Sequence, residues 1–392
     1  MRQFSSLAFI KTLILGFIDS QRFMRFYIVD GLLRWRHKQT TSKTLLVVQI
    51  EGIGDYILFR NFLETLKTAE RYRGYSITLC GNESYKDLAM TFDSQTVSDF
   101  IWVNHNSFKR HLFYRFALLA KIRRKGFEVV LNPVYSRDSI LEDSIVRAAG
   151  ARESVGCKGD FIHAKHWERK IFNKYYTELI DISQSAVFEF SKIKEYFEKL
   201  LDKNISVRKP SLPSLLRQAN DMKYAVVCPG ALLSKRRWHI ENFLHLIDYL
   251  HSKYGLTSFL VGDIHDLPAQ KEQQSIAERS YAINMIGKSD LCQTIALIQG
   301  SMLVVSNDTS IAHIGAAADI PVVVISNGNH FGRFTEYPKE LHPAVFYAYP
   351  PEIAGSRFSF EELVEKFKDG SSLNIQTIAV DTVKNLVDKA LK

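Results

Sequence analysis

The sequence predicts an α/β protein with two halves, each built on a mostly parallel, doubly wound sheet, that face each other across a central cleft. Short apolar, strand-like runs alternate with helical segments, and the alternation stops near residue 210 and then starts again. A chain of 392 residues is also too long for one ordinary core. We expect domains over residues 44–209 and 210–375, with a basic segment over 1–43 before them and a helix over 376–392 after them.

The composition is typical of a globular protein, with 46% hydrophobic and 24% charged residues. Four widely separated cysteines form no Cys-x-x-Cys pair, so neither a disulfide framework nor a zinc site is indicated, and a reducing, cytoplasmic compartment is favoured. No Asp-x-Asp motif is present, which removes the usual way of holding a metal with a nucleotide diphosphate. We therefore expect no metal site.

The N-terminal segment carries much of the excess positive charge. The whole chain has 51 basic and 42 acidic residues, and residues 1–43 hold eight basic residues against two acidic ones. The apolar run over residues 7–18 contains Lys11 and is shorter than the roughly 20 residues that a membrane-spanning helix needs. A basic, aromatic, amphipathic segment suits the surface of an anionic membrane. The alternative is a helix that packs on the protein's own core or contacts a partner.

The first half is expected to begin with a buried strand over residues 44–50, a turn over 51–55 and an amphipathic helix over 56–67. Further strands are expected over 76–80, 99–103 and 127–131, with a basic helix over 108–125 and a longer helical region over 167–204. Residues 209–213 contain two prolines and interrupt the pattern as an interdomain linker does.

Asp55 is the candidate for acid–base chemistry in this half. It follows Gly52-Ile53-Gly54, which resembles part of a dinucleotide-binding turn, but Ile57 stands where that fingerprint has its third glycine. A carboxylate at a strand-to-helix turn faces the ligand crevice and can accept a proton from an attacking hydroxyl. The alternative is that Asp55 only caps the following helix.

In the second half, strands are expected over residues 224–228, 257–261, 302–305 and 321–325, and helices over 240–254, 269–279 and 377–391. Between the last two strands, a polar turn beginning at Ser306 precedes a helix of small residues that ends near Ala318. Asp308 or Thr309 is expected to cap this helix. The backbone N–H groups that follow would then bind an anion such as a diphosphate.

Two further loops at this sheet edge carry cations. The turn 229–238 contains Lys235, Arg236 and Arg237, which suit a phosphorylated ligand because they offset charge on a leaving diphosphate; a solvated basic turn is the alternative. The loop 327–334 contains two glycines and Arg333, a further candidate phosphate contact. The two histidines of residues 163–166 lack a third ligand nearby, which indicates a surface segment and not a metal site.

Six short segments, in a fixed order, carry a resemblance to a known family. They are 45–55 (LLVVQIEGIGD), 128–132 (EVVLN), 154–156 (SVG), 229–238 (PGALLSKRRW), 284–288 (NMIGK) and 307–313 (NDTSIAH). Through them, residues 44–390 resemble the heptosyltransferases of glycosyltransferase family 9, which build the inner core of lipopolysaccharide.

The resemblance implies a GT-B fold of two Rossmann-like domains and a metal-independent, inverting transfer of a heptose or related sugar. The donor would be a nucleotide diphosphate sugar, with ADP-heptose the expected one, and no further cofactor is implied. The acceptor would be a lipid-linked glycan such as the lipopolysaccharide core, and the protein would be cytoplasmic and peripheral at the inner face of the inner membrane. No recognition helix or zinc-finger pattern supports nucleic acid as a partner.

Asp55 matches the family's candidate general base, and Asp308, Thr309 and His313 match its donor-diphosphate motif. Lys235 or Arg236 would stabilise the leaving diphosphate. The full set of expected donor-side residues is Gly230, Ser234, Asp263, Asp308, Thr309, Ser310, His313 and Arg333, and the expected acceptor-side residues are Gly52, Gly54, Asn132 and Arg137.

The chain departs from the family pattern at three positions. Ser310 stands where a glycine is usual, Arg236 stands where a lysine is usual, with Lys235 one residue earlier, and His239 replaces a proline. These changes bear on the identity of the donor more than on the fold. Two alternatives to a transferase are a sugar-nucleotide epimerase of the same architecture and a non-catalytic relative that only binds glycan or nucleotide.

Overall fold

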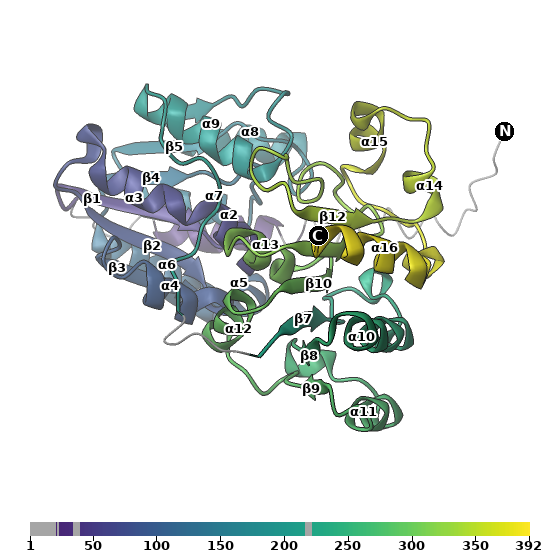
Figure 1. Ribbon diagram of the computed structural model, residues 1–392. Helices are drawn as coiled ribbons and strands as arrows, with labels where there is room; N and C mark the ends of the chain where they lie inside the picture. Colours follow the sequence, from purple (N-terminus) through teal and green to yellow (C-terminus); the bar gives the residue numbers. More distant parts are fainter. Residues whose placement is uncertain (1–20, 22, 34–39, 216–221) are drawn as a thin grey trace.

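The protein folds into two α/β domains, each with one six-stranded parallel sheet (Figure 1). The computed structural model describes residues 21, 23–33, 40–215 and 222–392. The alternation of apolar runs and amphipathic helices predicts two doubly wound sheets, and the structure confirms this fold class.

The first sheet has the strand order β3-β2-β1-β4-β5-β6, and all neighbouring strands are parallel. Its strands are β1 (Thr44–Gln49), β2 (Ser76–Asn82), β3 (Asp99–Val103), β4 (Val129–Asn132), β5 (Glu153–Cys157) and β6 (Glu178–Ile180). Its helices are α2 (Ile53–Phe59), α3 (Asn61–Thr68), α4 (Lys86–Phe92), α5 (His105–Arg110), α6 (Leu112–Lys125), α7 (Glu142–Ala149), α8 (His166–Phe172) and α9 (Glu189–Leu201). Helices cover both faces of this sheet, which is why the central strand β1 reads as a continuous apolar run.

The second sheet has the order β12-β11-β10-β7-β8-β9 and is also parallel throughout. Its strands are β7 (Tyr224–Cys228), β8 (Thr257–Leu260), β9 (Ala282–Asn284), β10 (Leu303–Asn307), β11 (Val322–Ile325) and β12 (Val345–Ala348). Its helices are α10 (Ile240–Tyr254), α11 (Gln270–Ala277), α12 (Leu291–Gln299), α13 (Ser310–Ala317), α14 (Pro351–Ala354), α15 (Phe360–Phe367) and α16 (Val380–Ala390). Short 3-10 helices are η2 (Glu70–Tyr72), η3 (Glu83–Tyr85), η4 (Asn173–Tyr175), η5 (Ser234–Arg236), η6 (Ile264–Asp266) and η7 (Ile375–Thr377).

The strand order reverses direction at one point in each sheet. In the first sheet the chain runs outward from β1 and then restarts at β4 on its other side, and in the second sheet β7 and β10 have the same relation. Ligands of doubly wound proteins bind outside the carboxyl ends of the strands at such a point. The loops that follow β1, β4, β7 and β10 are therefore the ones that the fold places at a crevice.

The two domains touch through α2 and α13, which lie next to each other near the middle of the molecule (Figure 1). A β-carbon placed on Gly54 would lie 2.9 Å from His313 Cδ2 and 3.7 Å from the Ser310 Cα. One apolar cluster also continues across the contact, from Ile57 in α2 to Ile311 in α13. Gly54 therefore allows α2 and α13 to approach each other closely, because glycine has no side chain.

The described part of the N-terminal segment, residues 23–33, is helical and packs on the first domain. Asp30 is buried and accepts a hydrogen bond from Arg115 Nε at 2.8 Å, and the ring of Phe23 meets the ring of Phe172 edge-on at 5.9 Å. These residues thus pack on the protein's own core, as one of the two alternatives predicts. The apolar run over residues 7–18 lies outside the described residues. No helix in the described ranges is both long and apolar enough to cross a membrane.

Several predicted elements are wrong in extent. The longer helical region over 167–204 is instead α8, η4, the short edge strand β6 and α9. The helix expected over 56–67 breaks at Arg60, where the Leu63 N–H bonds the Arg60 carbonyl only three residues back, and the helix over 108–125 breaks at His111. The strands β5, β6, β9 and β12 are missed, and β6 and β9 have only three residues each, too few to carry a periodic pattern.

Candidate active site

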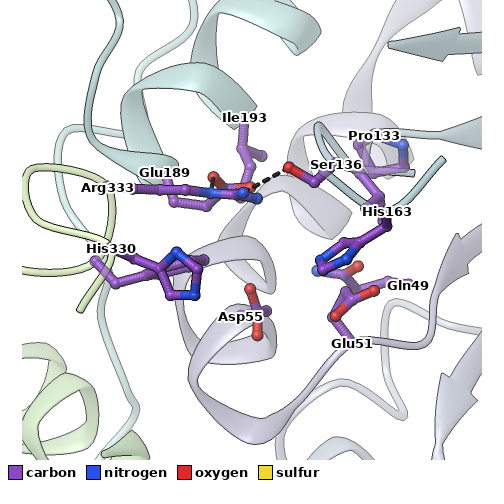
Figure 2. A pocket seen from close by; sticks show the side chains of 12 residues that line it. Gln49, Glu51, Asp55, Pro133, Ser136, His163, Glu189, Ile193, His330 and Arg333 are labelled. Atoms are coloured by element: carbon purple, nitrogen blue, oxygen red, sulfur yellow. Dashed lines mark hydrogen bonds and ion pairs between the residues drawn. The ribbon is translucent and has the colours of Figure 1, made fainter. Parts of the chain in front are cut away.

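A cavity of about 180 Å³ lies in front of the carboxyl end of β1, with walls from both domains (Figure 2). Its lining residues are Gln49, Glu51, Asp55, Pro133, Val134, Ser136, His163, Glu189, Ile193, His330, Arg333 and Phe334. The structure thus brings Asp55 and Arg333, which the sequence assigns to opposite sides of a reaction, to one cavity.

Asp55 reaches this cavity from the first turn of α2. The N-cap residue of α2 is Gly52, and no side chain caps the helix. Asp55 stands three residues further on, so its carboxylate is not committed to capping and points toward the open space between Glu51 and Arg333 (Figure 2). A carboxylate placed in this way can contact a ligand hydroxyl directly.

The surroundings of Asp55 favour its neutral form. Burial is the main cause, and the nearby negative charges of Glu51 and Glu189 add to it, while Arg333 opposes them; together they raise the pKa of Asp55 to about 8. A carboxylate with a raised pKa is a stronger base when it is ionised, which is a property of groups that remove protons from poorly acidic hydroxyls.

Arg333 belongs to the loop after β11, yet its partners lie in the first domain. Its Nε donates to Glu189 Oε2 at 2.7 Å, its Nη1 donates to Ser136 Oγ at 2.5 Å, and the Glu189 N–H donates to its carbonyl at 2.9 Å. The bond to Ser136 is drawn as a dashed line in Figure 2, where the Glu189 side chain lies beside Arg333. Arg333 therefore holds the loop of the second domain against α9, and its role as a phosphate contact stays a prediction.

The helix N-terminus that the sequence predicts as an anion site in the second domain is the start of α13. Thr309 is its N-cap residue, and its Oγ1 accepts a hydrogen bond from the Ile311 N–H at 3.3 Å. Asp308, which is 5% exposed, does not cap; its Oδ2 lies 2.9 Å from Arg236 Nη2, and its carbonyl oxygen also accepts from that guanidinium. The pairing fixes a cation beside the N-terminal end of the helix, an arrangement suited to a diphosphate.

The remaining donor-side residues lie on the loops that follow β7 and β8. Lys235 is exposed, and its Nζ donates to the Ser371 carbonyl at 3.0 Å. Ser234 begins the short helix η5, and Asp263 caps η6 by accepting from the His265 N–H at 2.9 Å. Gly230 allows the Asp266 carboxyl to approach, because an added β-carbon would lie 2.2 Å from Asp266 Cγ.

His313 lies inside the domain contact and not on an open surface. Its Nδ1 shares a hydrogen bond of 2.7 Å with the Tyr337 hydroxyl, and burial lowers its pKa to about 4. The imidazole is therefore neutral at physiological pH. Ser310, the first residue of α13, stands at the same contact opposite Gly54.

Asn132 and Arg137, expected on the acceptor side, are fully buried behind the cavity wall. Asn132 Nδ2 donates to the Tyr176 hydroxyl at 2.8 Å, and Arg137 pairs with Asp143 at 2.9 Å. They do not line the cavity, so any effect on an acceptor would pass through the shape of the loop after β4, which carries Ser136.

Gln49, Glu51, Glu189, His163 and His330 line the cavity but are not among the residues that the sequence picks out as candidates. The sequence offers a signal for Glu51, because this residue begins the turn that also contains Asp55. It offers no signal for Glu189, because acidic residues are common in the first turn of a helix, where they interact favourably with the helix dipole. Within the described ranges, no group of three or more His, Cys, Asp or Glu side chains is arranged to hold a metal ion.

Comparison with known proteins gives a consistent result. The family model described as glycosyltransferase family 9 (heptosyltransferase) matches residues 115–338. The chain is 22% identical over 295 residues to lipooligosaccharide heptosyltransferase 2 of Haemophilus ducreyi, a match that covers 72% of this chain and 82% of that relative.

Solved structures resemble the chain over most of its length. The crystal structure of a family 9 glycosyltransferase from Veillonella parvula has a TM-score of 0.66 at 17% identity, covering 91% of this chain and 99% of that one. The Escherichia coli heptosyltransferase WaaC, solved with ADP-2-deoxy-2-fluoro heptose, has a TM-score of 0.62 at 16% identity, covering 88% and 99%. At these identities the likeness shows a common fold.

Proposed function

Because the chain belongs to glycosyltransferase family 9, the heptosyltransferase family, we propose that it transfers a heptose or related sugar from a nucleotide diphosphate sugar to a lipid-linked glycan, with inversion and without a metal. The observation that carries this proposal is the contact between α2 and α13. It brings Gly54, the residue before Asp55, against Ser310 and His313 of α13, whose N-terminal end is the proposed diphosphate site. A base and a leaving-group site that face each other are what a direct displacement needs.

In the proposed reaction, the ionised carboxylate of Asp55 removes the proton of an acceptor hydroxyl. The hydroxyl oxygen bonds to the anomeric carbon of the donor while the bond from that carbon to the diphosphate oxygen breaks. The nucleotide diphosphate leaves with the electron pair, and Arg236, Lys235 and the N–H groups at the start of α13 stabilise its charge. Arg333 holds the second-domain loop against α9, which supports alignment of the two substrates.

The proposed donor is ADP-heptose. Its support is the family together with the E. coli relative, whose structure contains ADP-2-deoxy-2-fluoro heptose. A thermal-shift panel of ADP, UDP, GDP and CDP tests this choice, because a ligand that binds only the folded state raises the melting temperature. We expect the largest shift with ADP, and a larger shift with another diphosphate would contradict the donor assignment.

The proposed acceptor is a glycan on a lipid, with lipopolysaccharide core the expected class. A second cavity of about 560 Å³ adjoins the one in front of Asp55, since His163 lines both. Phe23 of the N-terminal helix also lines this second cavity. The proposal is that a glycan bound at Asp55 extends along the second cavity toward this helix.

We place the membrane-facing surface on the outer side of the same helix. Met24, Ile28 and Leu32 recur every four residues and are 48%, 58% and 58% exposed. Trp167, which packs against Phe23, is 39% exposed, and the helix itself belongs to the basic segment over residues 1–43. Apolar side chains flanked by basic residues favour peripheral binding to an anionic bilayer at the cytoplasmic face.

Vesicle co-sedimentation tests this surface. Replacing Ile28 and Leu32 by Glu should abolish binding to vesicles that contain anionic lipid, whereas Met302→Glu, at a comparably exposed position in the second domain, should leave binding intact. Equal binding by the double variant and the control would contradict the assignment.

Product analysis tests the transfer itself. With ADP-heptose and a lipid-linked glycan, we expect ADP and a glycan enlarged by one heptose with inverted anomeric configuration, at the same rate with and without a chelator. An epimerase would isomerise the donor without an acceptor, and a non-catalytic relative would bind it without turnover. Either outcome would overturn the proposal.

A further inference from the structure

The wall in front of Asp55 presents a buried hydrogen-bond acceptor that has no partner among the described residues. Gln49 is 3% exposed and lines the cavity, and its Oε1 accepts no hydrogen bond from any described residue. Glu51 adds a carboxylate to the same wall, beside Gln49 in Figure 2. A buried oxygen without a donor is costly, so the natural occupant of this space brings N–H or O–H groups to it.

Three polar side chains of the lining, those of Arg333, Ser136 and His330, already have partners within the protein. Arg333 binds Glu189 and Ser136, and its Nη1 lies 3.9 Å from Asp160 Oδ2. The Ser136 hydroxyl in turn donates to Asp160 at 2.7 Å. His330 bonds the Lys368 carbonyl through Nδ1 at 2.8 Å, and burial lowers its pKa, so it adds no positive charge. The one guanidinium of the lining is therefore neutralised before a ligand arrives.

The charge of the cavity is consequently negative. Among the described residues that line it, the carboxyl groups of Glu51 and Glu189 stand against the single guanidinium of Arg333, and Asp55 adds a further negative charge whenever it is ionised. Burial is the main cause of the raised pKa of Asp55, and among the neighbouring charges the two glutamates raise this pKa more than Arg333 lowers it. An anionic ligand group at this place would be repelled by the two glutamates, and the guanidinium of Arg333 is already paired with Glu189.

From these contacts we propose that the acceptor unit entering the cavity is a sugar without carboxylate or phosphate, whose hydroxyls donate to Gln49 and Glu51. Anionic groups elsewhere on the glycan lie outside this cavity. The inference rests on the proposed function in one respect, the assignment of the space in front of Asp55 to the acceptor.

A binding experiment tests the proposal apart from catalysis. The probes are a methyl glucoside and the matching methyl glucuronide, which differ by a carboxylate, and saturation-transfer NMR measures their binding to the full chain with ADP present. We expect the glucoside to bind at least about tenfold more tightly, as repulsion between like charges in a partly buried site requires. Glu51→Lys should reverse the preference, while Glu241→Lys, an exposed change on α10, should not.

Equal or tighter binding of the glucuronide by the unmodified protein would overturn the proposal, as would a preference that Glu51→Lys leaves unchanged. If neither glycoside gives a signal, a measurement without any glycan tests the charge of the cavity. In that experiment, ¹³C NMR follows the titration of the Asp55 carboxyl, whose pKa should fall in Glu51→Gln; an unchanged pKa contradicts a negative cavity.

The outcome is separable from that of the proposed function. A protein that binds the glucoside selectively but transfers no sugar would contradict the proposed function alone. A protein that transfers heptose to a uronic acid unit would confirm the transfer and overturn this inference.

Discussion

Arg333 and Glu189 are joined twice across the domain boundary, by the Nε–Oε2 bond of 2.7 Å and by the Glu189 N–H that donates to the Arg333 carbonyl at 2.9 Å. The two side chains act on Asp55 with opposite signs, because Glu189 raises its pKa and Arg333 lowers it. The same ion pair therefore links the closeness of the domains to the protonation of the proposed base.

This relationship predicts opposite shifts in the pH dependence of kcat/KM. Activity needs ionised Asp55, so it should rise with pH through about 8 in the unmodified protein. Arg333→Gln should move this rise to higher pH, and Glu189→Gln should move it to lower pH. A purely structural loosening of the domain contact would move both variants in the same direction, and that result would contradict the electrostatic coupling. Glu241→Gln serves as the control for a lost charge elsewhere.

Gly54→Ala should show whether Gly54 is needed for the contact between the two domains or only affects the stability of α2. Alanine ordinarily stabilises a helix by up to about 1 kcal/mol relative to glycine. Here the new β-carbon would lie 2.9 Å from His313 Cδ2, so we expect a lower melting temperature and a loss of kcat of about tenfold or more, as small misplacements of reacting groups produce. In the matched variant Gly52→Ala the nearest atom is Asp55 Oδ2 at an ordinary 3.5 Å, and a similar loss of stability there would contradict this explanation.

Arg236 should contribute more to donor binding than Lys235. Arg236 is held at the start of α13 by Asp308, whereas Lys235 is exposed and bonded to the Ser371 carbonyl. A hydrogen bond to a charged group contributes roughly 1.5–3 kcal/mol, so Arg236→Gln should raise the Kd for the nucleotide diphosphate by about tenfold or more. Calorimetric titration of both variants checks the order, and a larger effect of Lys235→Gln would reverse the assignment.

The Asp30–Arg115 pair should matter for stability, since both side chains are at most 1% exposed. Asp30→Ala leaves a buried guanidinium unpaired, and we expect a loss of about 3–5 kcal/mol in the free energy of unfolding. Asp99→Ala removes the partner of Lys125 in a pair that is 37–44% exposed and should cost at most about 1 kcal/mol. Denaturant titration compares the two. A small loss for Asp30→Ala would show that the N-terminal helix is dispensable for the fold.

The sequence predicts the layers of the fold well because long apolar runs and the spacing of amphipathic helices are local signals. The strands β3 and β7 and the helix α10 are found with their observed bounds. The region over 167–204 fails because a three-residue edge strand such as β6 depends on pairing with β5, which no local pattern records.

The features of the candidate site also differ in whether a local sequence pattern predicts them. Asp55 and the start of α13 are predictable, because motifs at the carboxyl ends of strands are local. Their closeness depends on Gly54 meeting His313, and the side chains around Asp55 come from segments more than a hundred residues apart. The sequence suggests Arg333 as a phosphate contact because a basic residue in a glycine-containing loop is typical of such a role, and only the folded chain shows its bond to Glu189.

The central claim is that Asp55 removes the acceptor proton, and Asp55→Asn tests it most directly. The amide keeps the shape of the side chain but has no basic carboxylate. We expect heptose transfer to fall by about 100-fold or more, in line with the loss of general base catalysis, while the calorimetric Kd for the nucleotide diphosphate stays within about twofold. Transfer by Asp55→Asn at the rate of the unmodified protein would contradict the account.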